Sequence, residues 1–593
     1  MEERARPKNR EQPVTTRSET MSASARPSPF CSLSAVPKLN ATLPSILTLA
    51  LCLAAAPTVA QPVPSSAEVF SQHSSNERFD LFSQPETNDQ VGAALAAGDF
   101  GGSGFLDLAI GVPREDYLSN DVQRVDAGWT HVIEGSATGL DASVGVEDAP
   151  WDQDGDIQGG PESGDLVGWA VAVGDFDGDG WDDLVMGAPG ESVGGENNTG
   201  CINVIYGSPN GLTTAGNRQL WQSRVVDGGT VPGAAEADDR FGHSLAVGNF
   251  NGDLYDDLAI GVPDEDVFVT VNRVDAGGIV VLYGSADGLT PVGSQGITRN
   301  APGMVVAVTA GDEFGYALAA GDFDGDTFDD LAIGARYDDE AGHDRGSVDI
   351  LYGSASGLDT TTHEVWHLDS PGIDYPDEQG EELGAALATG DFDADGRDDL
   401  AIGVPNHDGG TSEEGRVLVL YGSSSGITTA GHLLVDQDTP FVAGEPEEDD
   451  NFGQALAAGD LDGDGADELI VGIPGERYVS GPANRDGAGA AQIFQGAPIF
   501  GLDPTQNQIL DYSLVGDPAL SDGFATALLA ADFDASGTDD LAFTVPRRLV
   551  RDQSNQLISA AGEIVVVYSA GGAAIFVDGF ESGDTTRWSQ SVP

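Results

Sequence analysis

The sequence predicts an all-β protein, a seven-bladed β-propeller, and three observations lead to this prediction. One acidic loop recurs seven times along the 593 residues, and consecutive copies start 69 to 76 residues apart. Each unit contains four short apolar segments that lack the periodicity of a helix. A repeated unit of four short strands is typical of a propeller blade. The loops begin at Asp99, Asp175, Asn249, Asp322, Asp391, Asp460 and Asp532.

Residues 1–60 differ from the rest of the chain and are predicted to be a secretory leader. They hold seven basic residues and an apolar stretch, Leu43–Ala56, followed by a small-residue cleavage site. A basic region, a short apolar core and such a site are the three parts of a signal peptide. Because Cys31 and Cys52 lie in this leader, the exported chain keeps Cys201 alone and forms no internal disulfide.

The charge balance excludes two classes of partner. Asp and Glu number 98 against 25 Lys and Arg, which gives a formal net charge of −73. Such a chain has too few cations to neutralise nucleic-acid phosphates or to bind an anionic membrane surface. Beyond the leader, no apolar run reaches the roughly 18 residues of a membrane-spanning helix. We therefore expect no nucleic acid and no membrane span, and a secreted or cell-surface, extracytoplasmic location.

Each blade is predicted to contain four strands in a fixed order. The first resembles Phe314–Gly321, the second Asp399–Gly403 and the third Val417–Gly422. The fourth lies around Trp221 or Trp366 in the corresponding blades. Because the first two strands are small and apolar throughout, we expect them to be buried on both faces.

The ring is predicted to be closed by an N-terminal strand. Blade seven has three strands, of which Glu563–Tyr568 is the last, and only a polar tail, 573–593, follows its final turn. Arg78–Phe82 occupies the place that fourth-strand segments occupy ahead of the other blades. Because an unpaired outer edge invites aggregation, we expect Arg78–Phe82 to pair with Glu563–Tyr568. The propeller domain then covers residues 66–572.

The acidic loops have the composition of a calcium site. Carboxylates recur at loop positions 1, 3, 5 and 9, and the backbone carbonyl at position 7 offers a further oxygen. Carboxylates this close repel one another unless a cation joins them, and Ca²⁺ accepts about six to eight oxygens in loose geometry. We predict about four strong Ca²⁺ sites. Their residues are Asp175, Asp177, Asp179, Trp181 and Asp183; Asp322, Asp324, Asp326, Phe328 and Asp330; Asp391, Asp393, Asp395, Arg397 and Asp399; and Asp460, Asp462, Asp464, Ala466 and Glu468.

Two further loops are predicted to be weaker sites, and the loop of blade one is predicted to bind no metal. Blade one keeps only Asp99 and Asp107 with Ser103, and Gly101 removes a ligand. An EF-hand is excluded in the four strong loops, because position 12 is apolar and lies in a predicted strand where an EF-hand has Glu. The weaker sets are Asn249, Asn251, Asp253 and Asp257, and Asp532, Asp534 and Asp540.

Paired short motifs at the start and end of these segments resemble a known repeat. Phe241-Gly242 is followed by Gly261-Val-Pro263, and Phe452-Gly453 by Gly472-Ile-Pro474. The pattern resembles the FG-GAP repeat, and seven copies resemble the propeller of integrin α subunits and its prokaryotic relatives. The resemblance implies Ca²⁺ in the hairpin loops and partners on the opposite face. Val91-Gly92, Leu383-Gly384 and Phe524-Ala525 depart from the pattern.

Two patterns associated with catalysis fall on unsuitable structure. His363 and His367 form a His-Glu-x-x-His pattern, but in the predicted strand they stand about 13 Å apart and cannot share one zinc ion. Gly422–Gly426 matches a nucleophile elbow, which needs a strand followed by a helix, whereas this segment is predicted to be the turn after a third strand.

These observations favour a binding module over an enzyme. We expect an adhesion or ligand-binding propeller whose partner is an extracellular protein or glycan. Its binding face would be built from loops between the second and third strands, such as Arg114–Ala127 and Asp264–Ala276. Two alternatives remain open because a fold does not determine function. They are a propeller enzyme that acts on glycans or lipids, and a structural surface or matrix protein.

Overall fold

The computed structural model describes most of the predicted propeller. The predicted leader and the tail 573–593 lie outside the residues it describes. The described residues are 66–70, 89–119, 122–140, 150–154, 157–338, 345–373, 375, 380–408, 413–480, 483–514, 519, 521–548, 550–551, 557–558 and 562–569.

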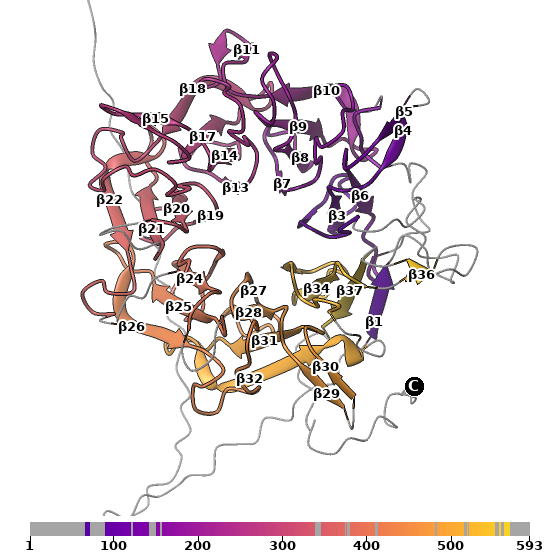
Figure 1. The fold of residues 1–593 in the computed structure, drawn as a ribbon, viewed down its shortest axis with the longest axis vertical. Helices are drawn as coiled ribbons and strands as arrows, with labels where there is room; N and C mark the ends of the chain where they lie inside the picture. The colour runs from indigo at the N-terminus through magenta and orange to yellow at the C-terminus, as the bar shows by residue number, and fades with distance from the viewer. Residues whose placement is uncertain are drawn as a thin grey trace, which may run out of the picture. The chain divides into compact units, whose positions relative to one another are not determined.

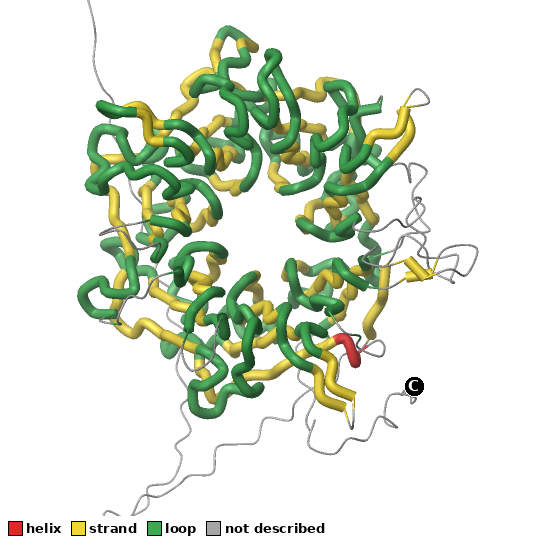
Figure 2. Tube along the Cα trace, viewed as in Figure 1, coloured by secondary structure: helices red, strands yellow, loops and turns green. Residues whose placement is uncertain are grey.

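Seven antiparallel sheets stand side by side in a ring, so the chain is all-β and forms a seven-bladed propeller (Figures 1 and 2). Six sheets have four strands, and blade one has three within the described residues. From the axis outward, the strands are β2 (Leu95–Gly98), β3 (Asp107–Val112) and β6 (Trp129–Ile133) in blade one; β7 (Val171–Gly174), β8 (Asp183–Ala188), β9 (Cys201–Tyr206) and β10 (Thr213–Leu220) in blade two; β13 (Leu245–Gly248), β14 (Asp257–Val262), β17 (Gly278–Tyr283) and β18 (Thr290–Ile297) in blade three; β19 (Leu318–Gly321), β20 (Asp330–Ala335), β21 (Ser347–Tyr352) and β22 (Asp359–Trp366) in blade four; β23 (Leu387–Gly390), β24 (Asp399–Val404), β25 (Arg416–Tyr421) and β26 (Thr428–Val435) in blade five; β27 (Ala455–Gly459), β28 (Glu468–Ile473), β31 (Ala490–Gln495) and β32 (Asp503–Asp511) in blade six; and β33 (Leu528–Ala531), β34 (Asp540–Val545), β37 (Glu563–Tyr568) and β1 (Ser66–Phe70) in blade seven.

Short hairpins project between the second and third strands of four blades. They are β4 (Tyr117–Ser119) with β5 (Val122–Arg124), β15 (Val267–Phe268) with β16 (Asn272–Arg273), β29 (Tyr478–Ser480) with β30 (Ala483–Arg485), and β35 (Val550–Arg551) with β36 (Leu557–Ile558). A further pair, β11 (Val225–Val226) with β12 (Gly229–Thr230), follows the outer strand of blade two. In the described part of the chain, the only helix is the 3-10 turn η1 (Tyr512–Leu514), and no helix is long and apolar enough to cross a membrane.

The predicted second strands are confirmed, and the predicted first strands are only partly right. Every residue of β24 is buried, as both-face burial requires. In contrast, β19 alternates half-buried and buried positions. The first residues of six innermost strands, such as Val171, Leu318 and Leu387, line an open cavity of about 290 Å³ at the propeller axis. The expectation that the first strands are buried on both faces is therefore wrong.

The predicted start of the first strand also shifts, for a local reason. In blade four Phe314 lies outside β19 and makes an isolated parallel bridge to Gly277 of the preceding blade. Gly315 then turns the chain at a φ of 93°, a conformation that glycine adopts without strain. Fully buried Phe314 and Phe323 each pack in a hydrophobic cluster that joins neighbouring blades, so the core of this propeller lies between blades.

Glycine in the second strand allows adjacent blades to touch backbone to backbone. A Cβ added at Gly403 would lie 2.1 Å from the carbonyl oxygen of Gly453 in the next blade. Five other second-strand glycines stand in the same relation to the next Phe-Gly turn, at 2.0 to 2.4 Å. The second-strand glycine is thus needed at each of these contacts, whereas the residue that offers the carbonyl is glycine in five of them and Ala525 in the sixth. The other five second-strand glycines are Gly111, Gly187, Gly261, Gly334 and Gly472.

The outer edge of blade seven pairs with a segment from the N-terminal side of the ring. β1 runs antiparallel to β37, with Ser66 opposite Tyr568 and Phe70 opposite Ile564. The sequence analysis placed Arg78–Phe82 at this edge. That segment lies outside the described residues, and the edge is taken by β1, so this assignment is wrong.

Replacing Gly403 with Ala should destabilise the propeller strongly. The new methyl group meets a backbone carbonyl that cannot move without shifting the next blade, and overpacking of this kind lowers stability by about 1–3 kcal/mol or more. Melting temperatures of the full chain measure the effect. Gly160→Ala is the matched control, because nothing lies within 4 Å of its added Cβ and its φ is ordinary. Equal melting temperatures for the two variants would contradict the contact described here.

Candidate metal centres in the acidic loops

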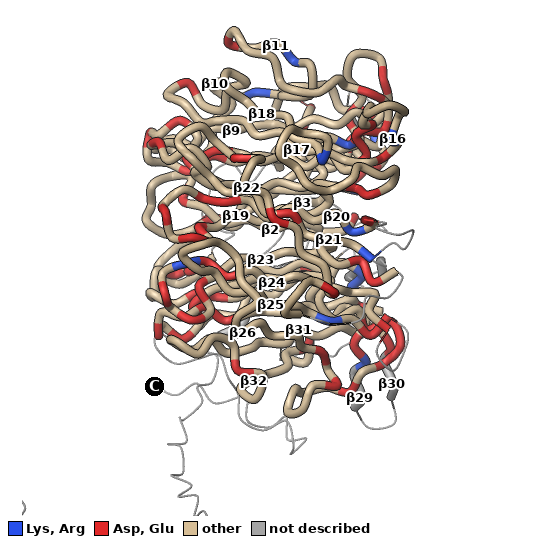
Figure 3. Tube along the Cα trace, turned by 90° about the vertical axis from the view of Figure 1, so that its left-hand side faces the viewer, with Lys and Arg blue, Asp and Glu red and all other residues tan. Residues whose placement is uncertain are grey.

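Each acidic loop is the hairpin that joins the first and second strands of a blade. In blade two Asp175 follows β7 directly, and Asp183 is the first residue of β8. Because the blades share one topology, all seven loops lie at the same end of the propeller. In side view, acidic residues gather at both ends of the propeller axis, and most of the basic residues lie toward the right-hand end (Figure 3).

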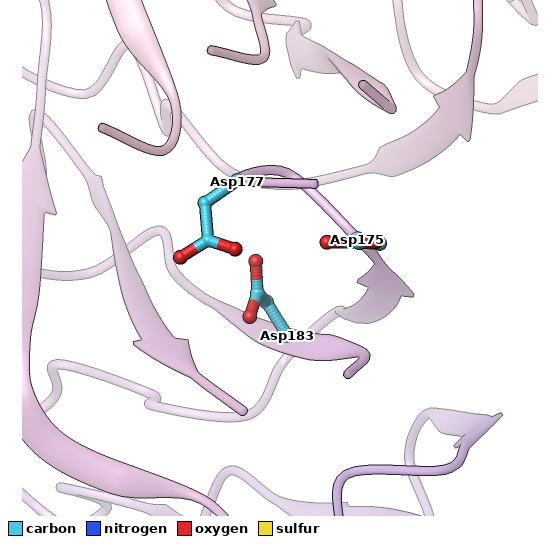
Figure 4. Close-up of side chains that lie close together, drawn as sticks. All are labelled: Asp175, Asp177 and Asp183. Carbon is cyan, nitrogen blue, oxygen red and sulfur yellow. The ribbon is translucent and has the colours of Figure 1, made fainter. Parts of the chain in front are cut away.

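Three carboxylates of the blade-two loop converge. Asp175, Asp177 and Asp183 each place one oxygen within 4.8 Å of the others, and the carboxylates of Asp177 and Asp183 face one another (Figure 4). Loop positions 1, 3 and 9 converge in the same way in blades four and five, whereas positions 1, 3 and 5 converge in blade six. The three further sets are Asp322, Asp324 and Asp330; Asp391, Asp393 and Asp399; and Asp460, Asp462 and Asp464.

The aspartate at position 1 folds the loop around itself. The Asp175 carboxylate accepts hydrogen bonds from the backbone N–H groups of Asp179 at 3.1 Å and Gly180 at 3.0 Å. Gly180 has a φ of 89°, so this turn favours glycine at position 6. Blade four closes the same turn with Thr327 at a φ of 78°. The equivalent bonds are made to Asp322 by Asp326 and Thr327.

The carboxylate at position 9 has a structural role in addition to its proposed ligand role. Asp183 is buried and accepts hydrogen bonds from Phe176 N at 3.0 Å and Gly207 N at 2.8 Å, which tie the loop to the end of β9. Burial raises the pKa of Asp183 to about 8, the two backbone bonds act against this rise, and repulsion from Asp177 and Asp175 adds to it. A cation between these carboxylates would relieve that repulsion.

Position 8 connects each loop to the preceding one, and the sequence analysis missed this role. Asp182 Oδ2 accepts the backbone N–H of Asp99 at 2.8 Å, while Asp182 N donates to the Asp99 carbonyl at 3.3 Å. The sequence does show an acidic pair at positions 8 and 9 in six blades. The backbone group that binds the position-8 side chain, however, lies about 80 residues earlier in the chain. Blade one has Leu106 at this position, so this side-chain bond cannot form between blades seven and one. The other five aspartates are Asp256, Asp329, Asp398, Asp467 and Asp539.

Positions 5 and 7 differ among the predicted strong loops. Position 5 is Asp179 in blade two, Asp326 in blade four and Asp395 in blade five, and the converging sets of those blades do not contain it. Asp395 is instead bound by Arg397 at 2.6 Å.

The side chain at position 7 packs on the preceding loop. A Cβ at Gly102 would meet Trp181 Nε1 at 2.5 Å, and one at Gly252 would meet the Phe328 ring at 2.4 Å. In blade six this position is the buried Ala466. Glu468 at position 9 of that blade accepts a bond from Gln495 Nε2 at 3.2 Å, and the same amide nitrogen donates to Asp462 at 2.5 Å.

The two loops predicted to be weaker are stabilised partly by their own side chains. In blade three the amide of Asn251 lies 3.5 Å from Asp257 Oδ1, and Asp253 accepts the N–H of Tyr255 at 2.9 Å. Asn249 at position 1 accepts the N–H of Asp253 at 3.1 Å.

The loop of blade seven keeps the wrapped geometry of the stronger ones. Asp532 accepts the N–H groups of Ser536 and Gly537, both at 2.8 Å, and Asp534 accepts that of Ser536 at 3.0 Å. Asp540 at position 9 accepts bonds from Phe533 and Ser569.

The oxygen donors of the strong loops suit a hard divalent cation. In blade five Asp393 Oδ1 is buried without a hydrogen-bond partner, next to Asp391 and Asp399. A buried carboxylate oxygen without a donor is unfavourable, and a bound cation would compensate it. The acid clusters therefore fit the calcium sites that the loop pattern implies.

Site quality should follow the number of ligands. Replacing Asp391 and Asp393 together with Ala should remove one bound divalent cation, because two of three converging carboxylates disappear. Replacing Asp99 should remove none, because Gly101 leaves position 3 of that loop without a ligand and position 5 is Ser103. Native mass spectrometry of the full chain in Ca²⁺ counts the ions. Equal losses from the two variants would contradict this ranking.

Comparison with known proteins places these features in a family. A model of the FG-GAP repeat matches residues 167–200, 241–282, 314–351, 383–420 and 452–494, which lie in blades two to six. Human phosphatidylinositol-glycan-specific phospholipase D is 26% identical over 429 residues, which cover 68% of this chain and 46% of that protein. Integrin alpha pat-2 of Caenorhabditis briggsae is 31% identical over 284 residues, 45% of this chain and 20% of that protein.

Among solved structures, the exotype rhamnogalacturonan lyase YesX matches with a TM-score of 0.35 and 11% identity, covering 86% of this chain and 75% of the lyase. The chain spans less than half the length of the curated relatives named here. The repeat matches, the two sequence relatives and the seven sheets lead to one conclusion. This chain is an FG-GAP repeat protein with a seven-bladed β-propeller, related to integrin α subunits and to phosphatidylinositol-glycan-specific phospholipase D.

Proposed function

We propose that this protein is an exported, calcium-binding propeller that acts as an adhesion or ligand-binding module. The observation that carries the proposal is the convergence of three carboxylates in four separate loops of one FG-GAP propeller. Repeated metal sites far from any shared reaction centre suit a rigid scaffold. Export is proposed from the leader at residues 1–60, which the sequence predicts.

Calcium is the proposed cation because of the donor chemistry and the variation among loops. The donors are carboxylate and carbonyl oxygens, which Ca²⁺ and Mg²⁺ both prefer. Mg²⁺ demands near-ideal octahedral geometry, whereas Ca²⁺ tolerates irregular sites. The loops differ in which positions converge, and blade five engages one carboxylate with Arg397. Such irregularity favours Ca²⁺.

The proposed ligand face lies at the end of the propeller opposite the acidic loops. The hairpins β4–β5 and β15–β16 stand between second and third strands, and thus at that end. Side chains at the second hairpin are exposed, Phe268 by 72% and Val271 by 54%. Exposed apolar groups beside acidic ones suit contact with an extracellular protein or glycan.

An enzyme that acts on glycans or lipids is the second candidate. The similarity to phosphatidylinositol-glycan-specific phospholipase D favours it, although this chain covers less than half of that protein. A structural surface or matrix protein is the third. One set of assays on the full chain, with and without Ca²⁺, separates them. Calcium-dependent retention on a glycan array or on immobilised matrix proteins supports the binding module. Release of a phosphatidylinositol-glycan anchor supports the enzyme. The absence of both retention and release supports the structural role.

Chelation should lower the melting temperature sharply. With about 1 mM free Ca²⁺ and a Kd near 10⁻⁴ M, each site adds about 1.4 kcal/mol. Four such sites would add about 6 kcal/mol, comparable to the net stability of a whole domain. Calorimetry of the full chain with EDTA and with millimolar Ca²⁺ tests this. Superimposed melting curves would contradict the calcium proposal, while equal protection by Mg²⁺ would contradict the choice of cation.

We further propose that the pairing of β1 with β37 closes the ring. Deletion of residues 61–70 should leave the outer edge of β37 unpaired, so the chain should aggregate or melt at lower temperature. Deletion of residues 578–593 is the matched control and should have a small effect. Size-exclusion chromatography and melting curves provide the readouts. Equal behaviour of the two deletions would contradict closure by the N-terminal strand.

A further inference from the structure

A second set of acidic residues recurs at the end of each blade opposite the acidic loop. An acidic residue that is at most 1% exposed lies two residues before the Phe-Gly position of each blade. A second titratable residue lies 26 residues after this acid. Because the acidic loop lies between the first and second strands, these two positions flank the other end of the strand pair. The pairs are Asp89 and Glu115, Asp165 and Glu191, Asp239 and Glu265, Asp312 and Asp338, Glu381 and His407, Asp450 and Glu476, and Asp522 and Arg548.

Three of these pairs receive a glutamine from the chain just ahead of their blade. In each, the glutamine Nε2 donates to the glutamate, at 2.7 Å in blade two, 2.6 Å in blade three and 2.5 Å in blade six. We call these sets the glutamine nodes. They are Gln153, Asp165 and Glu191; Gln222, Asp239 and Glu265; and Gln437, Asp450 and Glu476.

In blades four, five and seven, a basic side chain either belongs to the pair or contacts it. Arg299 stands where the glutamines stand, and its Nη1 lies 2.9 Å from Asp338 and 3.6 Å from Asp312. His407 Nδ1 lies 2.8 Å from Glu381 in blade five. Each of these pairs thus contacts or includes a basic side chain, whereas the side chain that donates to the glutamate of each node is a neutral amide.

Blade seven gives the simplest comparison. Its second position is Arg548, and Arg548 Nη1 lies 2.5 Å from Asp522. Asp522 therefore faces a guanidinium there, which also lies 3.7 Å from Glu563, whereas a glutamine node has two carboxyl groups at the same two positions. Ionising both carboxyl groups of a buried pair is unfavourable, so one of them must bind a cation or keep its proton.

The geometry of blade six favours a proton. Asp450 is fully buried, its Oδ2 accepts the N–H of Glu447 at 2.7 Å, and its Oδ1 is buried without a hydrogen-bond donor. Asp450, Glu476 and Glu447 each bring one oxygen within 4.8 Å of the others. Gln437 Nε2 donates to Glu476, so at this contact the amide offers its N–H and not its carbonyl oxygen, the atom that would ligate a metal ion. A carboxylic acid proton on Glu476 would supply the donor that Asp450 Oδ1 lacks.

The charges around the glutamine nodes are mostly negative. Glu447 and Glu414 face Asp450, and the nearby Arg477 is bound by Glu447 and Asp486. The node of blade three likewise faces acids, whereas the node of blade two faces one carboxylic acid and one arginine. The groups that face them are Glu162, Arg124, Tyr117 and Cys201 in blade two, and Glu236 and Asp266 in blade three.

We propose that each glutamine node holds one proton, shared between its aspartate and its glutamate, which makes the stability of the propeller depend on pH. This inference is independent of the calcium sites and of the proposed ligand, because the nodes lie at the opposite end of the strands from the acidic loops. The three protons take the place of the basic side chains that lie at these positions in blades four, five and seven.

The direction of the pH dependence follows from the folded and unfolded states. Burial raises the pKa of Glu191 and Glu265 to about 7 and of Glu476 to about 8; neighbouring carboxylates add to the rise and the glutamine N–H opposes it. An unfolded glutamate titrates near pH 4.3. The folded chain therefore binds more protons than the unfolded chain between these values. The stabilisation is complete below about pH 4 and is lost as the pH rises through about 7 to 8.

Proton release on unfolding tests the proposal directly. Glu191→Gln, Glu265→Gln and Glu476→Gln resemble the protonated acid in shape, so the variants should fold. The full chain is unfolded with denaturant in weak buffer near pH 6, and the released protons are counted. Each substitution should remove one released proton, and the triple variant three. Its melting temperature should also fall less between about pH 5 and pH 8 than that of the unmodified chain.

Asp522→Asn is the matched control, because its carboxylate already faces Arg548. It should lower the melting temperature at both pH values and leave the proton count near pH 6 unchanged. If a glutamate variant does not fold, Gln437→Arg tests the same node, since it copies the arrangement of Arg299 and should also remove one proton. An unchanged proton count in the triple variant would overturn the proposal. If the triple variant instead binds three fewer metal ions than the unmodified chain, the nodes are metal sites and the proposal is overturned.

Discussion

The close approach of neighbouring blades determines where the other contacts of this propeller can form. A second-strand glycine meets the carbonyl of the next Phe-Gly turn at a distance that leaves no room for a Cβ. At that spacing the aspartate at position 8 reaches the backbone of the preceding acidic loop. Tyrosines at the ends of third strands reach the next blade as well, as Tyr352 does when its hydroxyl accepts the N–H of Ile427 at 3.1 Å. The glycine–carbonyl contact thus sets the spacing at which the position-8 and tyrosine hydrogen bonds form between neighbouring blades.

Repulsion between carboxylates is the second constraint, and it is relieved differently at the two ends of the blades. The acidic loops gather carboxylates at exposed hairpins, where a cation from solution can enter. At the other end, the paired acids are buried, and compensation must come from within the fold. Arg299 and Arg548 supply positive charge in two blades, and His407 contacts Glu381 in a third. In a chain with a formal net charge of −73, such basic partners are scarce.

Much of the architecture could be predicted from the sequence because it depends on local patterns that repeat. The seven loops, the buried second strands and the Phe-Gly turns each follow from residues close together in the chain. Long-range pairing was harder to predict. Position 8 bonds to a loop about 80 residues away, and the outer edge of β37 takes Ser66–Phe70 instead of the equally apolar Arg78–Phe82. The buried pairs were overlooked because their second member changes from Glu to Asp, His or Arg while its position stays constant.

The absence of an acid at Leu106 gives the ring one interface unlike the other six. Between blades seven and one the position-8 bond is missing, and a threonine methyl, Thr544 Cγ2, faces Gly92 where the other blades have glycine against a carbonyl. The hydroxyl of Tyr568 still accepts the N–H of Leu140 at 2.8 Å. This interface therefore lacks two contacts that the other six share, so its alignment depends more heavily on the bond from Leu140 to Tyr568.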